Sequence, residues 1–151
     1  AAVTSIDPAR ALVASGGADA TVRLWSSAGE VSHLSCPAPV TALAWLTEPG
    51  LIAAGLATGD VVLLDPADGR IADRLEGAAA PVRHLAVLDR GRLLAAIGAD
   101  GKILFRDVGA RRTILRLDRG PVVSIAGAAG GGVFVLGGPE GRVQVWRVRL
   151  P

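Results

Sequence analysis

The sequence predicts an all-β fold built from four repeats, arranged like the blades of a propeller. Short apolar runs recur along the whole chain, beginning at Val3, Val40, Val82 and Val122. A second series, at Val22, Val61, Ile103 and Val143, recurs with closely similar spacings. No stretch shows sustained helical periodicity. Both series give a repeat of about 40 residues, which with four strands per repeat is typical of a β-propeller.

The first repeat illustrates how the strands are assigned. Runs of Val, Ile and Leu bounded by turn residues predict strands over Val3–Ile6, Ala11–Gly16, Thr21–Ser26 and Glu30–Ser35. Pro8 lacks a backbone N–H and therefore suits the turn between the first two strands. The same pattern predicts a single propeller domain over 1–151, with blades at 3–35, 40–75, 82–117 and 122–149.

The fourth repeat is predicted to be incomplete. It contains three strand-like runs, Val122–Ala126, Val133–Gly137 and Arg142–Val148. The first three repeats each have a fourth, outer run, at Glu30–Ser35, Arg70–Leu75 and Arg112–Leu117. We therefore expect three complete blades and one that lacks its outer strand.

The run LVASGGADATVRLWS, residues 12–26, resembles the repeat of the WD-repeat (WD40) family. Ser15, Asp19 and Trp25 fall at the family's Ser, turn Asp and Trp positions, and Ser26 replaces the final Asp. The other repeats retain fewer of these residues, namely Asp65 in the second, Asp100 and Asp107 in the third, and Glu140 and Trp146 in the fourth. The Ala/Arg-rich composition is similar to that of bacterial members.

The resemblance implies a structural role for these residues. In the family a Gly-His pair precedes each first strand, and this His joins the Ser, Asp and Trp in a buried hydrogen-bonded set. The Gly-His pair is absent here, so we expect blades held mainly by aliphatic packing. Trp25 and Trp146 are predicted to be buried where blades pack together.

The resemblance also implies a ring larger than four blades, because WD-repeat rings usually have seven or eight and close with an N-terminal strand. A stack of four blades would leave two sheet faces bare. Three assemblies are open: half of a larger propeller completed by another polypeptide, two copies pairing into eight blades, or a four-bladed ring or artificial fragment.

Composition argues against several functions. Sixteen Lys and Arg balance 14 Asp and Glu, and aromatic residues are few, which disfavours a nucleic-acid partner. There is one cysteine, no signal-peptide pattern at the N-terminus and no apolar run of about 20 residues, so we expect a cytoplasmic protein without a membrane association. His33, Cys36 and His84 do not form a zinc or catalytic pattern, so no metal, cofactor or enzymatic activity is predicted.

The predicted function is that of a non-catalytic scaffold for a protein or peptide. Propellers bind partners where the turns between second and third strands gather with the linkers between blades, and loops on a rigid scaffold commonly carry function. The candidate partner-binding residues are Asp19, Ala38, Thr58, Ala80, Asp100, Arg119 and Glu140. The alternative is a regulatory or sensor region of a larger bacterial protease, kinase or signalling ATPase.

Overall fold

The computed structural model describes residues 3–77, 79–118, 122–127 and 132–147. These residues form four antiparallel sheets, which we number as blades 1 to 4 in chain order. Blade 1 comprises β1 (Val3–Asp7), β2 (Leu12–Gly16), β3 (Thr21–Ser26) and β4 (Gly29–Ser35). Blade 2 comprises β5 (Val40–Leu46), β6 (Leu51–Leu56), β7 (Val61–Asp65) and β8 (Arg70–Leu75).

The other two blades follow the same plan. Blade 3 comprises β9 (Val82–Leu88), β10 (Leu93–Gly98), β11 (Ile103–Asp107) and β12 (Arg112–Leu117). Blade 4 comprises β13 (Ser124–Gly127), β14 (Val133–Gly137) and β15 (Val143–Arg147). Among the described residues blade 4 therefore has three strands, without the outer strand that the other blades possess.

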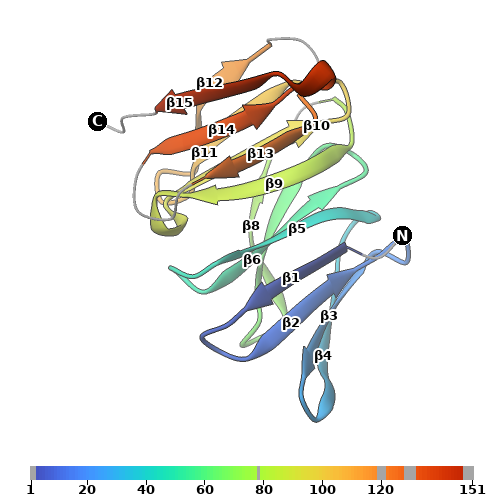
Figure 1. The fold of residues 1–151 in the computed structure, drawn as a ribbon. Coiled ribbons are helices and arrows are strands. Elements are labelled where there is room, and N and C mark those ends of the chain that lie inside the picture. The colour runs from blue at the N-terminus through green and yellow to red at the C-terminus, as the bar shows by residue number, and fades with distance from the viewer. Residues whose placement is uncertain (1–2, 78, 119–121, 128–131, 148–151) are drawn as a thin grey trace.

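The blades stack in chain order, as Figure 1 shows from the blue blade 1 to the red blade 4. Within each blade, consecutive strands are neighbours in the sheet. The first strands β1, β5, β9 and β13 contact one another in succession and form one side of the stack. This arrangement is that of consecutive β-propeller blades, as the repeat period predicts.

The hydrophobic core lies between the blades. Three clusters of buried side chains fill the junctions between blades 1 and 2, 2 and 3, and 3 and 4. Blade 2 is covered on both faces, and the four residues Val61–Leu64 of β7 are all buried. Blade 1 is covered on one face, so β3 alternates between buried and exposed residues. Stacking therefore explains the aliphatic content of the middle repeats.

Most strand boundaries agree with the sequence-based expectation to within one residue, as in β1, β2, β4 and the start of β15. The structure differs at the start of blade 4, where the first strand spans Ser124–Gly127 rather than Val122–Ala126. The expected third strand of this blade ends at Val148, which lies outside the described residues. Two short 3-10 turns, η1 (Asp89–Gly91) and η2 (Pro139–Gly141), were not expected.

Candidate protein-binding surface

The turn between the second and third strands has the same backbone hydrogen bond in all four blades. The N–H of the first turn residue donates to the carbonyl oxygen four residues later: Gly17 to Thr21, Leu56 to Asp60, Gly98 to Lys102 and Gly138 to Arg142. Each turn ends on a residue with positive φ, and these residues are Ala20 (60°), Gly59 (94°), Gly101 (77°) and Gly141 (75°). Four equivalent turns therefore project from the same edge of the stack.

The linkers between blades are attached to these turns. The N–H of Ala57 donates to Pro39 O at 2.9 Å, and that of Ala99 donates to Pro81 O at 2.8 Å. Val40 N donates to Gly17 O at 3.0 Å, which ties the start of blade 2 to the turn of blade 1. We call this edge of turns and linkers the upper rim. These backbone bonds fix the relative positions of its loops.

The candidate rim residues differ in how far they are exposed. Asp19, Thr58, Asp100 and Glu140 are exposed, and Ala80 is half-buried. Ala38 is 9% exposed and packs into the core between blades 1 and 2, so only its backbone belongs to the surface. Arg119 lies outside the described residues.

Two of the acidic rim residues shape their own turns. Asp19 Oδ1 accepts from Thr21 N at 3.2 Å, and Asp100 Oδ1 accepts from Lys102 N at 3.2 Å. The bonds from Thr21, followed by those from Arg23, lower the pKa of the Asp19 carboxyl. Both carboxylates also face a cation, Arg23 at 3.5 Å and Lys102 at 3.7 Å. Both carboxylates stabilise their turns and are nevertheless exposed, so a partner can reach them.

On the opposite edge of the stack, the last residue of the third strand stabilises the turn that follows it in blades 1 to 3. Asp65 Oδ1 accepts from Ala67 N at 2.8 Å, and Asp107 Oδ1 accepts from Ala110 N at 2.8 Å. Ser26, which replaces the family's Asp, serves the same purpose because its Oγ accepts from Ala28 N at 3.2 Å. These side chains therefore stabilise turns in the way typical of Asp and Ser.

The tryptophans at the family position have different surroundings. Trp25 Nε1 donates to Ser15 Oγ at 2.8 Å, but the side chain is 36% exposed and the prediction that it is buried was wrong. It points away from blade 2, to a face that no described residue covers. Trp146 is half-buried against the blade 3–4 core, and its ring lies parallel to that of Phe134 with centroids 6.4 Å apart. Full burial of Trp146 was therefore also not found.

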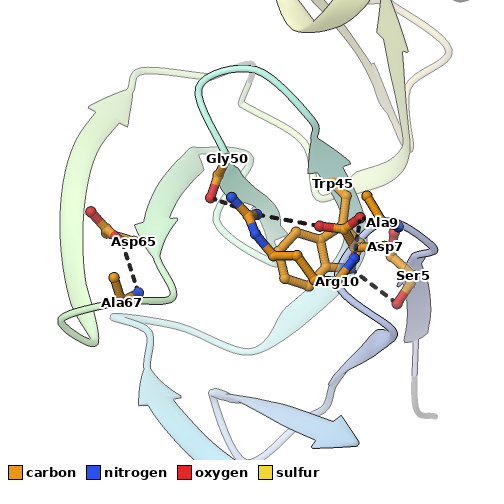
Figure 2. Close-up of polar contacts among 8 residues, drawn as sticks. All are labelled: Ser5, Asp7, Ala9, Arg10, Trp45, Gly50, Asp65 and Ala67. Carbon is orange, nitrogen blue, oxygen red and sulfur yellow. Dashed lines mark hydrogen bonds and ion pairs between the residues drawn. The ribbon is translucent and has the colours of Figure 1, made fainter.

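Sequence reasoning did not single out the polar contacts that join blades 1 and 2. Figure 2 shows Trp45 of β5 donating from Nε1 to Ser5 O of β1 at 3.3 Å. It also shows Arg10 between the buried carboxylate of Asp7, at 3.3 Å, and Gly50 O, at 3.5 Å. Trp45 is 7% exposed. The sequence feature that could have identified Trp45 is its position in an apolar run predicted to be a first strand.

Blade 4 carries an open apolar face. Val143 and Val145 are 68% and 70% exposed, and Val145 pairs with Val135 on the neighbouring strand. The equivalent residues of the other blades are buried by the blade that follows: Val22 and Leu24, Val61 and Leu63, and Ile103 and Phe105. The open face of blade 1 is more polar, since Arg23 and Ser15 accompany Trp25 and Ile6. The valine face of blade 4 thus corresponds to the blade-packing face of the other blades, and no described residue covers it.

Nothing resembling a reaction centre is found among the described residues. No three side chains of His, Cys, Asp or Glu gather there as a metal site would require. Burial raises the pKa of the Cys36 thiol to about 11, which keeps the thiol protonated and unreactive at neutral pH. The His33 side chain is 70% exposed, and its Nδ1 lies 3.9 Å from Glu30 Oε1. In the described part of the chain no helix is long and apolar enough to cross a membrane.

Comparisons with known proteins agree with this architecture. Residues 1–26 match the family model described as WD domain, G-beta repeat. Pre-mRNA-splicing factor cwf17 of Schizosaccharomyces pombe is 26% identical over 153 residues, covering 97% of this chain and 45% of that protein. Cell division cycle 20.1, cofactor of APC complex, of Arabidopsis thaliana is 31% identical over 137 residues, covering 85% of this chain and 30% of that protein. The chain thus spans less than half the length of each of these relatives.

Proposed function

We propose that the chain is a non-catalytic protein-binding scaffold, and that it forms part of a larger propeller completed by another polypeptide or by a second copy. WD repeats generally mediate protein–protein interaction, and the two relatives are by name a splicing factor and a cofactor of a complex. The observation that carries the proposal is the open valine face of blade 4. Val143 and Val145 occupy positions that a following blade buries in each of the first three blades.

The upper rim is the proposed surface for a further protein or peptide. Its exposed members are the turn residues Asp19, Thr58, Asp100 and Glu140, with Ala80 of a linker beside them. The hydrogen bonds between linkers and turns hold these residues in place before a partner arrives. A preorganised surface loses less conformational entropy on binding than a mobile one, which favours affinity.

Site-specific crosslinking tests the rim. A photo-crosslinking residue placed at Thr58, an exposed turn residue of the upper rim, should capture a defined polypeptide in cells that produce the full protein. The matched control is Asp68, which is exposed in the turn between β7 and β8 on the opposite edge. We expect an adduct from position 58 and none from position 68. Equal capture at both positions, or none from position 58, would contradict the rim as a binding surface.

A further inference from the structure

A pocket with a volume of about 580 Å³ lies between blades 2 and 3, on the edge of the stack opposite the upper rim. Blade 2 contributes residues of the β5–β6 turn and of β8 to its lining. Blade 3 contributes η1 and the turn between β11 and β12. The pocket is therefore separate from the binding surface proposed above, and its volume is within the usual range for ligand sites.

The floor of the pocket is apolar. Leu63 and Val108 are buried in the core between blades 2 and 3, and Leu51 is half-buried against the same core. All three side chains line the pocket. The pocket thus opens onto the hydrophobic core of this junction, and an aliphatic group bound there is removed from water.

The charged groups of the lining balance one another. They are three carboxylates and three guanidinium groups, on Glu48, Asp73, Asp89, Arg90, Arg92 and Arg111. Asp73 Oδ2 faces Arg111 Nε at 3.3 Å. Arg92 Nε lies 4.0 Å from Asp107 Oδ2. A lining without net charge favours neither an anion nor a cation, so the apolar floor decides what the pocket binds.

Two contacts between blades 2 and 3 fix the walls of the pocket. A Cβ on Gly91 of η1 would overlap Glu48 O, so the turns of the two blades touch at this point. The ion pair between Arg111 and Asp73 joins blade 3 to blade 2 a second time. The walls are therefore in position before a ligand arrives, which reduces the entropy lost on binding.

The junction of blades 1 and 2 has an arginine where this junction has a pocket wall. The first two strands are joined by a four-residue turn in both blades, 8–11 in blade 1 and 47–50 in blade 2. Arg10 is the third residue of its turn and reaches Gly50 O of blade 2 at 3.5 Å (Figure 2). Pro49 has the same place in the blade 2 turn, and it lines the pocket instead of bridging to blade 3 with a polar group.

We propose that this pocket binds an aliphatic side chain, of the size of leucine, from a protein partner. The inference rests on the proposed protein-binding function and adds a second surface to it. A cavity of about 150 Å³ is enough for a benzene-sized group, so this pocket also has room for the backbone on either side of the bound side chain. Glu48 and Arg90 are exposed on the lining and form no ion pair within the described part of the chain. Glu48 can accept a hydrogen bond from a backbone N–H of the partner, and Arg90 can donate one to a carbonyl oxygen.

Two short peptides test the pocket on the full chain. Acetyl-Gly-Leu-Gly-amide should shift the NMR signals of the Leu63 and Val108 methyl groups saturably. Acetyl-Gly-Asn-Gly-amide should bind at least ten-fold more weakly, because its side-chain amide loses hydrogen bonds to water on an apolar floor. The methyl signals of Leu24, which is buried between blades 1 and 2, should not move.

A larger side chain in the lining should block the pocket. Ala72 is an exposed residue of the lining, so Ala72→Trp fills the pocket without disturbing the core. We expect this variant to bind the Leu peptide at least ten-fold more weakly than the unmodified chain does. Ala67→Trp is the matched control: it places the same side chain in the turn between β7 and β8, outside the lining, and should leave binding unchanged.

The proposal fails if the Leu and Asn peptides bind equally, or if Ala72→Trp binds the Leu peptide as the unmodified chain does. If 4-methylpentanamide, which has the same alkyl group without a peptide backbone, binds as tightly as the Leu peptide, the assignment to a protein partner fails. Crosslinking at Thr58 reports separately on the upper rim, and its control position Asp68 lies outside the pocket lining. Capture from position 58 without binding of the Leu peptide would exclude the pocket and leave the rim standing. Binding of the Leu peptide without capture from position 58 would exclude the rim instead.

Discussion

At the scale of single residues, the aromatic side chains differ in how much they contribute to the packing of the blades. Phe134 is 1% exposed, and its ring centroid lies 4.8 Å from that of Phe105 across the junction of blades 3 and 4. Trp25 is 36% exposed and is held by a hydrogen bond to Ser15. Burial and not residue type should therefore decide which substitution is more damaging.

Phe134→Ala should lower the free energy of unfolding by about 3–5 kcal/mol, because it empties a fully buried site. Trp25→Ala should cost less, about 1–2 kcal/mol, since a partly exposed ring and one hydrogen bond are lost. Urea unfolding of both variants at one pH measures the difference. Ser15→Ala, which removes only the hydrogen-bond acceptor, is the control and should cost about 1 kcal/mol. A loss for Trp25→Ala as large as that for Phe134→Ala would contradict the exposure of Trp25.

The sequence predicts which face of a strand a side chain lies on better than it predicts whether that side chain is buried. The repeat aligns Trp25, Leu64, Arg106 and Trp146, and the alternation of side chains along a strand puts them on corresponding faces. Whether such a residue is covered depends on the neighbouring blade, which is why the burial of Trp25 was predicted wrongly. Arg106 is likewise only 5% exposed, although its charge alone would favour an exposed position.

At the scale of secondary-structure elements, the sequence predicts strands well and tight turns less well. The observed β3, β8, β12 and β14 have the boundaries that the apolar runs predict. The η1 turn was missed because it requires a left-handed backbone at Arg90, with φ of 56°, which residue type alone does not favour. The contacts of the linkers were also missed, because they join segments distant in sequence.

The linker between blades 2 and 3 depends on one close approach. Gly77 packs against the turn of blade 2 so tightly that a Cβ on Gly77 would overlap Gly59 O and lie only 2.8 Å from Asp60 N. Asp60 adds a hydrogen bond to Gly77 N at 3.1 Å. The absence of a side chain at position 77 therefore lets the linker lie on the rim.

Gly77→Ala should destabilise the protein by about 1–3 kcal/mol, because the added methyl group overlaps backbone atoms that cannot move freely. Gly109→Ala is the matched control: its nearest neighbour would be Asp107 Oδ1 at 3.6 Å, an ordinary contact. The control should change stability by less than about 0.5 kcal/mol. Thermal unfolding of the two variants provides the comparison, and equal melting temperatures would refute the close packing of the linker.

At the scale of the whole molecule, the stack has two unlike ends. The open face of blade 4 presents Val143 and Val145 with Arg147 at the end of the strand, whereas the open face of blade 1 includes Arg23 and Ser15 beside Trp25 and Ile6. Exposed apolar surface of this kind marks an interaction site. Because the face repeats positions that are buried in the other blades, we propose another blade as its partner.

The native mass of the purified chain, measured by light scattering on a sizing column, tests this central claim most directly. The chain itself has a mass of 15.3 kDa. We predict either twice that mass or a stoichiometric complex with a second polypeptide, and the double variant Val143→Glu/Val145→Glu should abolish the association. Ile71→Glu, which adds a charge at an exposed apolar residue of β8, should leave it unchanged. A monodisperse species of 15.3 kDa at all concentrations would contradict the account.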